Sequence, residues 1–286
     1  VLGFIPVLVR GVPHAYSAFH MTGLHYVTVS CVLIPAMTVL YFEQGGSRSG
    51  RKNGLIVLFA LVSIAIPILC VSRFQLVFAV ILAVFTFCAS QKNVSPWLFV
   101  VAVVALIPCY VLLTVARSHD VTYLNGIFEM KNSRMPIFVS QPYIYIANNY
   151  ENFDCLVKAL PAHTWGIRML FPVWALTGLK FLYPYLVSFP IYVDKTELTT
   201  VTLIYDAYYD FGIIGVLVFA CILGAVCFFL VEKLREMKNP MGYLFYGQMA
   251  IYMMLSFFTT WFSNPTTWFY FLVTAVLTFY CSVSRR

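Results

Sequence analysis

Charged residues are scarce in this chain of 286 residues. Asp, Glu, Lys and Arg make up only 10% of it, whereas hydrophobic residues make up 61% and the mean hydropathy is +0.85. Soluble domains carry about 25% charged residues, so a water-soluble globular fold is excluded. The net charge of +7 does not indicate a nucleic-acid partner, because the basic residues stand at the ends of apolar segments, where they set membrane topology.

The sequence also lacks the cysteine and carboxylate patterns of disulfide-rich and metal-binding proteins. Of the eight cysteines, only Cys155 lies outside the apolar segments, so there is neither a disulfide framework nor a paired metal-ligand spacing. No Asp-x-Asp metal signature is present. We therefore expect no metal site and no cofactor.

Long apolar stretches dominate what is present. Crossing a membrane takes about 20 apolar residues, and seven stretches qualify: 23–42, 54–72, 74–90, 97–116, 211–231, 241–262 and 266–283. The sequence thus predicts an all-α fold, a polytopic membrane helix bundle with about seven spanning helices. Membrane helices at 1–116 and 211–286 flank one large loop at 117–210. Because the apolar residues 1–9 follow no Met or signal peptide, we expect further helices before them.

Lys and Arg in the short connections predict the orientation of the bundle in the membrane. The turns at 43–53, 91–96 and 232–240 and the C-terminal tail all carry basic residues, and counting the crossings puts these four connections on the same side. Basic residues concentrate in cytoplasmic connections, so we expect the large loop to be extracytoplasmic. All five histidines fall in connections, or at helix ends, of that outer side.

The loop at 117–210 holds eight of the eleven acidic residues and many aromatic side chains. Loops carry chemistry more often than the scaffold that holds them, so we look for the functional site here. Apolar side chains recur at helical spacing over 146–160, which predicts an amphipathic helix. Residues 167–193 are apolar but interrupted by Pro and Gly, which predicts an interfacial or re-entrant segment with short helices.

Three arginines, Arg10, Arg73 and Arg117, are expected at the outer ends of spanning helices. Guanidinium forks bind phosphate oxygens bidentately, so the three together would suit a pyrophosphate. Each of them alone equally fits an interface residue whose side chain reaches the lipid headgroups. Arg168, within the loop, is a fourth candidate for binding phosphate.

Three titratable side chains are candidates for proton transfer. His163 is a candidate general base, or else a structural loop histidine. Asp206 and Asp210 are four residues apart, so on a helix they would share one face. They would then act as a base and its orienting partner, or pair with loop arginines. Asp210 alternatively caps the next spanning helix, with Gly212 and Gly215 allowing close helix packing.

Two segments resemble a known family. Residues 208–215, Tyr-Tyr-Asp-Phe-Gly-Ile-Ile-Gly, lead into a spanning helix and have Thr199 and Thr200 upstream. They resemble the end of the large loop in bacterial oligosaccharide repeat-unit polymerases, the Wzy-type O-antigen and capsule polymerases. Residues 143–153, Tyr-Ile-Tyr-Ile-Ala-Asn-Asn-Tyr-Glu-Asn-Phe, resemble the aromatic and Asn-rich segment that these proteins carry earlier in the same loop.

The resemblance implies a metal-independent, inverting glycosyltransferase in a bacterial plasma membrane. It would move a glycan from undecaprenyl pyrophosphate onto the non-reducing end of another lipid-linked repeat unit. The arginines would stabilise the departing pyrophosphate, and a histidine or aspartate would deprotonate the acceptor hydroxyl. Loop aromatics would stack on sugar rings, and we assign this role to Tyr145, Tyr150, Trp165 and Tyr205. A chain-length regulator and a flippase of the same pathway are the expected protein partners.

Three alternatives remain open. An O-antigen ligase uses the same lipid-linked donor with a different acceptor. A transporter or flippase of lipid-linked oligosaccharide would have charged residues inside its spans, internal repeats and short loops, unlike the nearly charge-free spans and single large loop of this chain. The third alternative is a non-catalytic partner in a glycan assembly complex. For the enzyme, we expect the loop to close over Arg10 and Arg73.

Overall fold

The computed structural model describes residues 5–8, 21, 23–91, 94–116, 121–234 and 236–283. Helices joined by turns and loops account for the folded elements, and no strand occurs within these described ranges. The predicted all-α class is therefore confirmed. The elements are η1 (Pro6–Leu8), α1 (Leu24–Val29), η3 (Ser30–Leu33), α2 (Ile34–Glu43), α3 (Gly50–Leu69), α4 (Arg73–Ser90), α5 (Trp97–Ala116), α6 (Val121–Ile127), α7 (Ile137–Ala159), α8 (Phe171–Leu176), α9 (Leu179–Leu182), η4 (Pro184–Leu186), α10 (Tyr205–Leu234), α11 (Gly242–Met254), η5 (Trp261–Ser263) and α12 (Pro265–Val283).

Five helical stretches among the described residues are long and apolar enough to cross a membrane. They are Leu24–Glu43, which combines α1, η3 and α2, together with α3, α4, α10 and α12. The chain therefore has the helices of a membrane protein, as its composition predicts. The sequence predicts seven spans, and that number is not confirmed.

α11 accounts for part of this difference. It has 13 residues and ends at Met254, so at a rise of 1.5 Å per residue it extends only about 20 Å, short of the ~30 Å hydrocarbon core. Turns and η5 occupy the rest of the expected span at 241–262. That span is therefore not one continuous helix. Its second part is a turn that connects α11 to α12.

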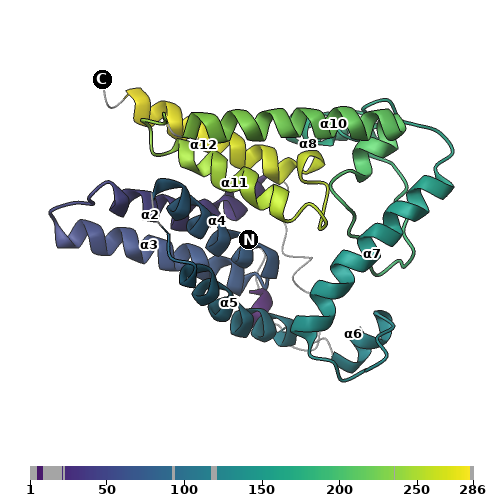
Figure 1. The fold of residues 1–286 in the computed structure, drawn as a ribbon, viewed down its shortest axis with the longest axis horizontal. Helices are drawn as coiled ribbons and strands as arrows, with labels where there is room; N and C mark the ends of the chain where they lie inside the picture. Colours follow the sequence, from purple (N-terminus) through teal and green to yellow (C-terminus); the bar gives the residue numbers. More distant parts are fainter. Residues whose placement is uncertain are drawn as a thin grey trace.

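The long helices, together with the shorter α11, form two groups that meet mainly through α4 and α11. In Figure 1, α2 to α5 lie together, α10 to α12 form the second group, and α7 crosses one end of both. α4 packs against α2 and α11, and α7 contacts α5 and α10. Fully buried side chains from three of these helices form the core: Leu40, Phe78, Leu82, Leu244, Ile251 and Tyr252. Packing of such side chains is what holds helices together within a bilayer.

The large loop folds into short helices around the long helix α7. α7 covers the predicted helix at 146–160 and begins earlier, at Ile137. The predicted interrupted segment at 167–193 contains α8, α9 and η4, none longer than six residues. Short helices within the loop are thus observed as predicted.

Three buried asparagines of α7 fasten other segments of the chain to this helix. The Nδ2 of Asn152 donates to the carbonyls of Leu198 and Thr200, both at 2.8 Å. Asn148 also donates to the Leu198 carbonyl, at 3.1 Å. Asn149 donates to the carbonyl of Phe257 at 2.6 Å, which ties the turn after α11 to the same helix. α7 therefore fixes both the segment that enters α10 and the α11–α12 turn.

Candidate functional site

A corner at Gly212 divides α10 into a buried part and an exposed part. The backbone there has φ 64° and ψ −151°, a conformation open essentially only to glycine. Before the corner Tyr205, Asp206 and Asp210 are buried, whereas Ile213 just after it is 70% exposed. The motif at 208–215 thus turns α10 from the packed loop into its apolar spanning part.

Gly215 allows this corner to close tightly. A Cβ atom at Gly215 would lie 2.4 Å from the carbonyl oxygen of Ala207, which is less than any van der Waals contact permits. The atoms that a Cβ atom at Gly215 would meet belong to Ala207 and Phe211 in the first part of α10 itself, and not to another helix.

Asp210 binds the turn that carries Arg168. Its Oδ1 accepts hydrogen bonds from the Thr164 hydroxyl and, at 3.3 Å, from the Arg168 backbone N–H. Its Oδ2 accepts from the Met169 backbone N–H at 2.8 Å, and its carbonyl from the Trp165 N–H at 3.1 Å. Because Asp210 is fully buried and both oxygens are engaged, its carboxylate positions the turn.

Arg168 and Asp206 form an ion pair through Nε and Oδ1. Their side chains are only 14% and 6% exposed. The guanidinium also lies over the ring of Tyr209, with Cζ 4.5 Å from the centroid, in a cation–π contact. Pairing of an aspartate of this segment with a loop arginine, one of the alternatives that the sequence offers for Asp206, is thus observed.

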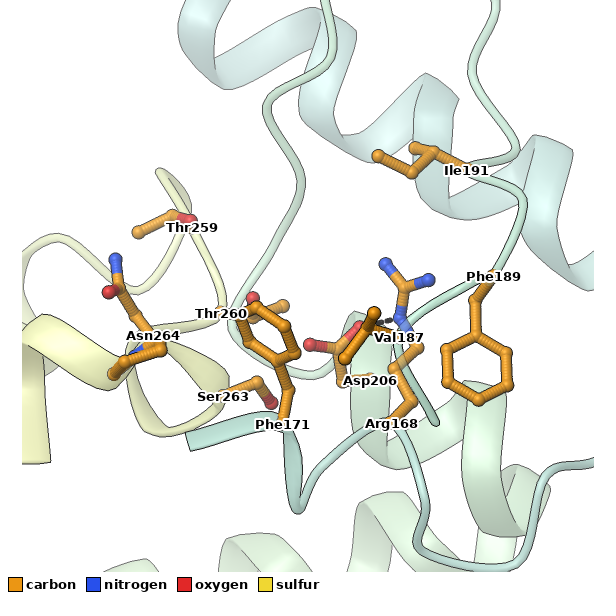
Figure 2. Close-up of a pocket in the computed structure, with 11 residues that line it drawn as sticks. Arg168, Phe171, Val187, Phe189, Ile191, Asp206, Thr259, Thr260, Ser263 and Asn264 are labelled. Atoms are coloured by element: carbon orange, nitrogen blue, oxygen red, sulfur yellow. Dashed lines mark hydrogen bonds and ion pairs between the residues drawn. The ribbon is translucent and has the colours of Figure 1, made fainter. Parts of the chain in front are cut away.

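The ion pair leaves part of each side chain unused. Nη1 of Arg168 is 3.5 Å from the carbonyl of Pro190, at the limit of a hydrogen bond. Arg168 Nη2 and Asp206 Oδ2 have no hydrogen-bond partner within the described ranges. In Figure 2 the second oxygen of Asp206 points away from Arg168, to the side where Thr260 and Ser263 lie. Both charged groups can therefore still bind a ligand.

These two residues line a cavity of about 370 Å³, within the roughly 300–1,000 Å³ of small-molecule sites. One wall is apolar, and its residues come from the loop between α8 and α10 and from α8 itself. The other wall is a stretch of the α11–α12 turn that is rich in hydroxyl and amide groups (Figure 2). The apolar wall consists of Phe171, Val187, Phe189 and Ile191, and the polar wall of Thr259, Thr260, Ser263 and Asn264.

Reasoning from the sequence missed the polar wall, which lies at the end of the expected span at 241–262 and just beyond it. Residues 259–267 read Thr-Thr-Trp-Phe-Ser-Asn-Pro-Thr-Thr. Clustered hydroxyl and amide residues with an Asn-Pro dipeptide mark a turn, so the signal was present. Asn264 Oδ1 accepts the Thr266 N–H at 2.9 Å, which caps α12 ahead of Pro265 at its first position.

His163 lies against the corner and does not line the cavity. Its Nδ1 is 3.2 Å from the carbonyl oxygen of Tyr209, and a Cβ atom at Gly212 would meet its Nε2 at 3.0 Å. The imidazole and the Tyr208 ring also form a T-shaped contact, with centroids 6.0 Å apart. This environment assigns His163 a packing contact at the glycine corner.

Of the three arginines expected at the outer ends of spanning helices, Arg10, Arg73 and Arg117, only Arg73 falls in a described part of the chain. It is 8% exposed, and its Nη1 donates to Gln141 Oε1 on α7 at 2.8 Å. It does not line the cavity. The neighbouring Phe74 stacks on Phe258 and Trp261 of the α11–α12 turn. Arg10 and Arg117 lie outside the described residues.

The four aromatic residues assigned to sugar stacking do not line the cavity. Tyr205 is fully buried, and its hydroxyl binds the N–H and the carbonyl of Tyr192 at 2.8 and 3.0 Å. Tyr145 packs edge-on against Phe258. Tyr150 and Trp165 are 59% and 76% exposed. The aromatic rings in the cavity are instead those of Phe171 and Phe189.

The comparisons with known proteins leave the site to be interpreted from its own geometry. No protein family, no curated protein and no solved structure matches this chain.

Proposed function

We propose that this chain is a membrane glycosyltransferase that polymerises oligosaccharide repeat units carried on undecaprenyl pyrophosphate. The observation that carries the proposal is the cavity in which the Arg168–Asp206 pair lies between an apolar and a polar wall. A lipid-linked sugar has the same three parts, since it joins an apolar chain, an anionic pyrophosphate and hydroxyl-rich rings. The resemblance of residues 143–153 and 208–215 to repeat-unit polymerases supports the same reaction.

Arg168 would bind the pyrophosphate of the donor. Its Nε is held by Asp206, while the terminal nitrogens can fork onto phosphate oxygens. The guanidinium is largely removed from water, and a fixed cation is most effective in such an environment. Negative charge grows on the pyrophosphate as it leaves, so Arg168 would stabilise the transition state more than the bound donor.

Asp206 would accept the proton of the attacking hydroxyl. It is the one carboxylate among the described residues that line the cavity, and its Oδ2 faces the cavity side away from Arg168 (Figure 2). The acceptor oxygen forms a bond to the anomeric carbon while the bond from that carbon to the pyrophosphate oxygen breaks. The proton passes to Oδ2, and the electron pair departs with undecaprenyl pyrophosphate. Attack opposite the leaving group inverts the anomeric configuration.

The distribution of Lys and Arg supports a place for this reaction at the outer face of a bacterial plasma membrane. The cavity lies beside the buried first part of α10, and the apolar spanning part begins at the corner after Phe211. A polyprenyl chain would therefore meet exposed apolar helix surface, such as that of Ile213 and Leu217, close to the cavity.

Reconstitution tests the proposal. Full-length protein in liposomes with purified undecaprenyl-pyrophosphate-linked repeat units should produce a ladder of longer lipid-linked glycans. Arg168→Lys keeps the charge that pairs with Asp206 but loses the guanidinium fork, so we expect the rate to fall about 100-fold or more. Arg134→Lys is the matched control, because Arg134 is exposed and lies outside the cavity.

Three results would contradict the polymerase. They are an undiminished ladder with Arg168→Lys, movement of substrate across the bilayer without chain growth, and transfer only to an acceptor other than a lipid-linked repeat unit. The second result would indicate a flippase and the third a ligase. Thermal unfolding of each variant in detergent identifies any loss of activity that comes from misfolding.

A further inference from the structure

The polar wall of the cavity carries hydrogen-bonding groups that the protein itself does not use. The hydroxyls of Thr259, Thr260 and Ser263 and the Nδ2 of Asn264 have no hydrogen-bond partner among the described residues. Two hydroxyls on the membrane helices illustrate the alternative: those of Thr38 and Thr278 donate to the carbonyl one turn earlier, at 2.9 and 2.7 Å. Unused donors and acceptors gathered on one side of a cavity are a feature of ligand sites.

The backbone that carries this wall is held in place. Asn149 of α7 binds the Phe257 carbonyl at 2.6 Å, and the Leu203 N–H donates to the Ser256 carbonyl at 2.7 Å. The indole N–H of Trp261 donates to the Leu255 carbonyl at 2.9 Å. Because the turn is already fixed, ligand binding to the wall costs little conformational entropy of the protein.

An aromatic ring faces the same space. Phe171, on α8, lines the same cavity as Thr260 and Ser263, and α8 contacts η5, which carries Ser263 (Figure 2). A sugar ring has both hydroxyl groups on its edge and C–H groups on its faces. Hydroxyl and amide side chains satisfy the first, while an apolar aromatic ring packs against the second.

We propose that the polar wall is a saccharide subsite. It binds one sugar ring with at least two neighbouring hydroxyls, which hydrogen-bond to Thr260, Ser263 and Asn264, while Phe171 packs against the ring face. This assignment rests on the proposed function, since that reaction places a sugar next to Arg168 and Asp206. The ring is either the first sugar of the donor or the terminal sugar of the acceptor, and both have the same chemistry.

Binding of soluble probes separates these two sources. Two probes are used: the free oligosaccharide, released by mild acid from the lipid-linked repeat unit, and the same oligosaccharide as a pyrophosphate with a short prenyl chain. Saturation-transfer NMR on the intact protein in detergent measures the dissociation constant of each. If both probes bind, and substitutions in the polar wall weaken both, the subsite holds the terminal sugar of the acceptor. If only the pyrophosphate probe binds, the subsite holds the first sugar of the donor.

Thr260→Val and Ser263→Ala remove one hydroxyl each with little change of volume. Each should weaken probe binding about 3- to 10-fold, the loss expected for one hydrogen bond. Thr278→Val is the matched control, because that hydroxyl bonds within α12, and it should leave binding unchanged. Equal binding by wild type and both wall variants overturns the subsite, and so does failure of the wild type to bind either probe.

The two proposals can fail separately. A wild-type protein that binds sugar through the wall but forms no glycan ladder keeps the subsite and loses the polymerase. A protein that forms the ladder with sugar affinity unaffected by Thr260→Val and Ser263→Ala loses the subsite alone.

Discussion

Arg168 and Asp206 should depend strongly on each other for stability, and a double-mutant cycle measures this dependence. The single variants are Arg168→Met and Asp206→Leu, and the double variant combines them. With side chains 14% and 6% exposed, each partner removed alone leaves the other as a nearly buried, unpaired charge. Breaking such a pair costs about 3–5 kcal/mol.

The double variant is expected to be far less affected than either single variant. Replacing a buried ion pair by apolar side chains of similar volume is often neutral or even stabilising. Because Tyr205 and Tyr209 already contact Arg168, a methionine there keeps an apolar neighbourhood. The coupling free energy should therefore be at least about 3 kcal/mol in favour of the pair.

Reversible unfolding in mixed detergent micelles gives the four free energies of unfolding. Glycan-ladder formation is measured on the same preparations, and all three variants should lose it, including the stable double variant. Additive effects, with each single variant costing less than about 1 kcal/mol, are what exposed pairs give. That result would refute the view of this pair as buried and mutually stabilising.

Two further substitutions test the parts that hold the site. Gly212→Ala puts a side chain on a left-handed backbone and against His163, so we expect a loss of about 1–3 kcal/mol; a thermal unfolding midpoint equal to that of wild type would argue against the corner. Asn149→Leu leaves the Phe257 carbonyl and the Thr200 hydroxyl without their partner, at about 1–3 kcal/mol per group. Hydrogen exchange should quicken at 255–260 and 198–203, and unchanged exchange there would speak against the tie to α7.

The sequence predicts the helices well because hydropathy depends on local composition. The apolar runs at 54–72 and 266–283 have the right length for a span, and α3 and α12 are found there. The expected span at 241–262 fails for a physical reason. The pair Trp261-Phe262 at its end is apolar, so hydropathy alone does not reveal the turn. Contacts to α7 and to the segment before α10 hold residues 255–263 in that turn.

The candidate site is less predictable because its contacts join distant parts of the chain. Arg168 and Asp206 are 38 residues apart, and no local spacing indicates that they pair. Burial is equally hidden in the sequence: Tyr205 and Tyr150 look alike as loop tyrosines, yet the first is fully buried and the second is 59% exposed. Residue types indicate which side chains can bind phosphate or sugar, but only packing decides which of them reach a cavity.

The asparagines of α7 and the aspartates of α10 affect how genetic data on this protein will have to be interpreted. Asn149 and Asp210 are both fully buried and hydrogen-bonded to segments distant in the sequence. An alanine scan scored by an activity alone would rank both of them with the residues that line the cavity. Complementation data therefore need a parallel measure of protein abundance in the membrane. In this fold, polar side chains both hold the cavity in shape and would contact a ligand, so residue type does not separate the two roles.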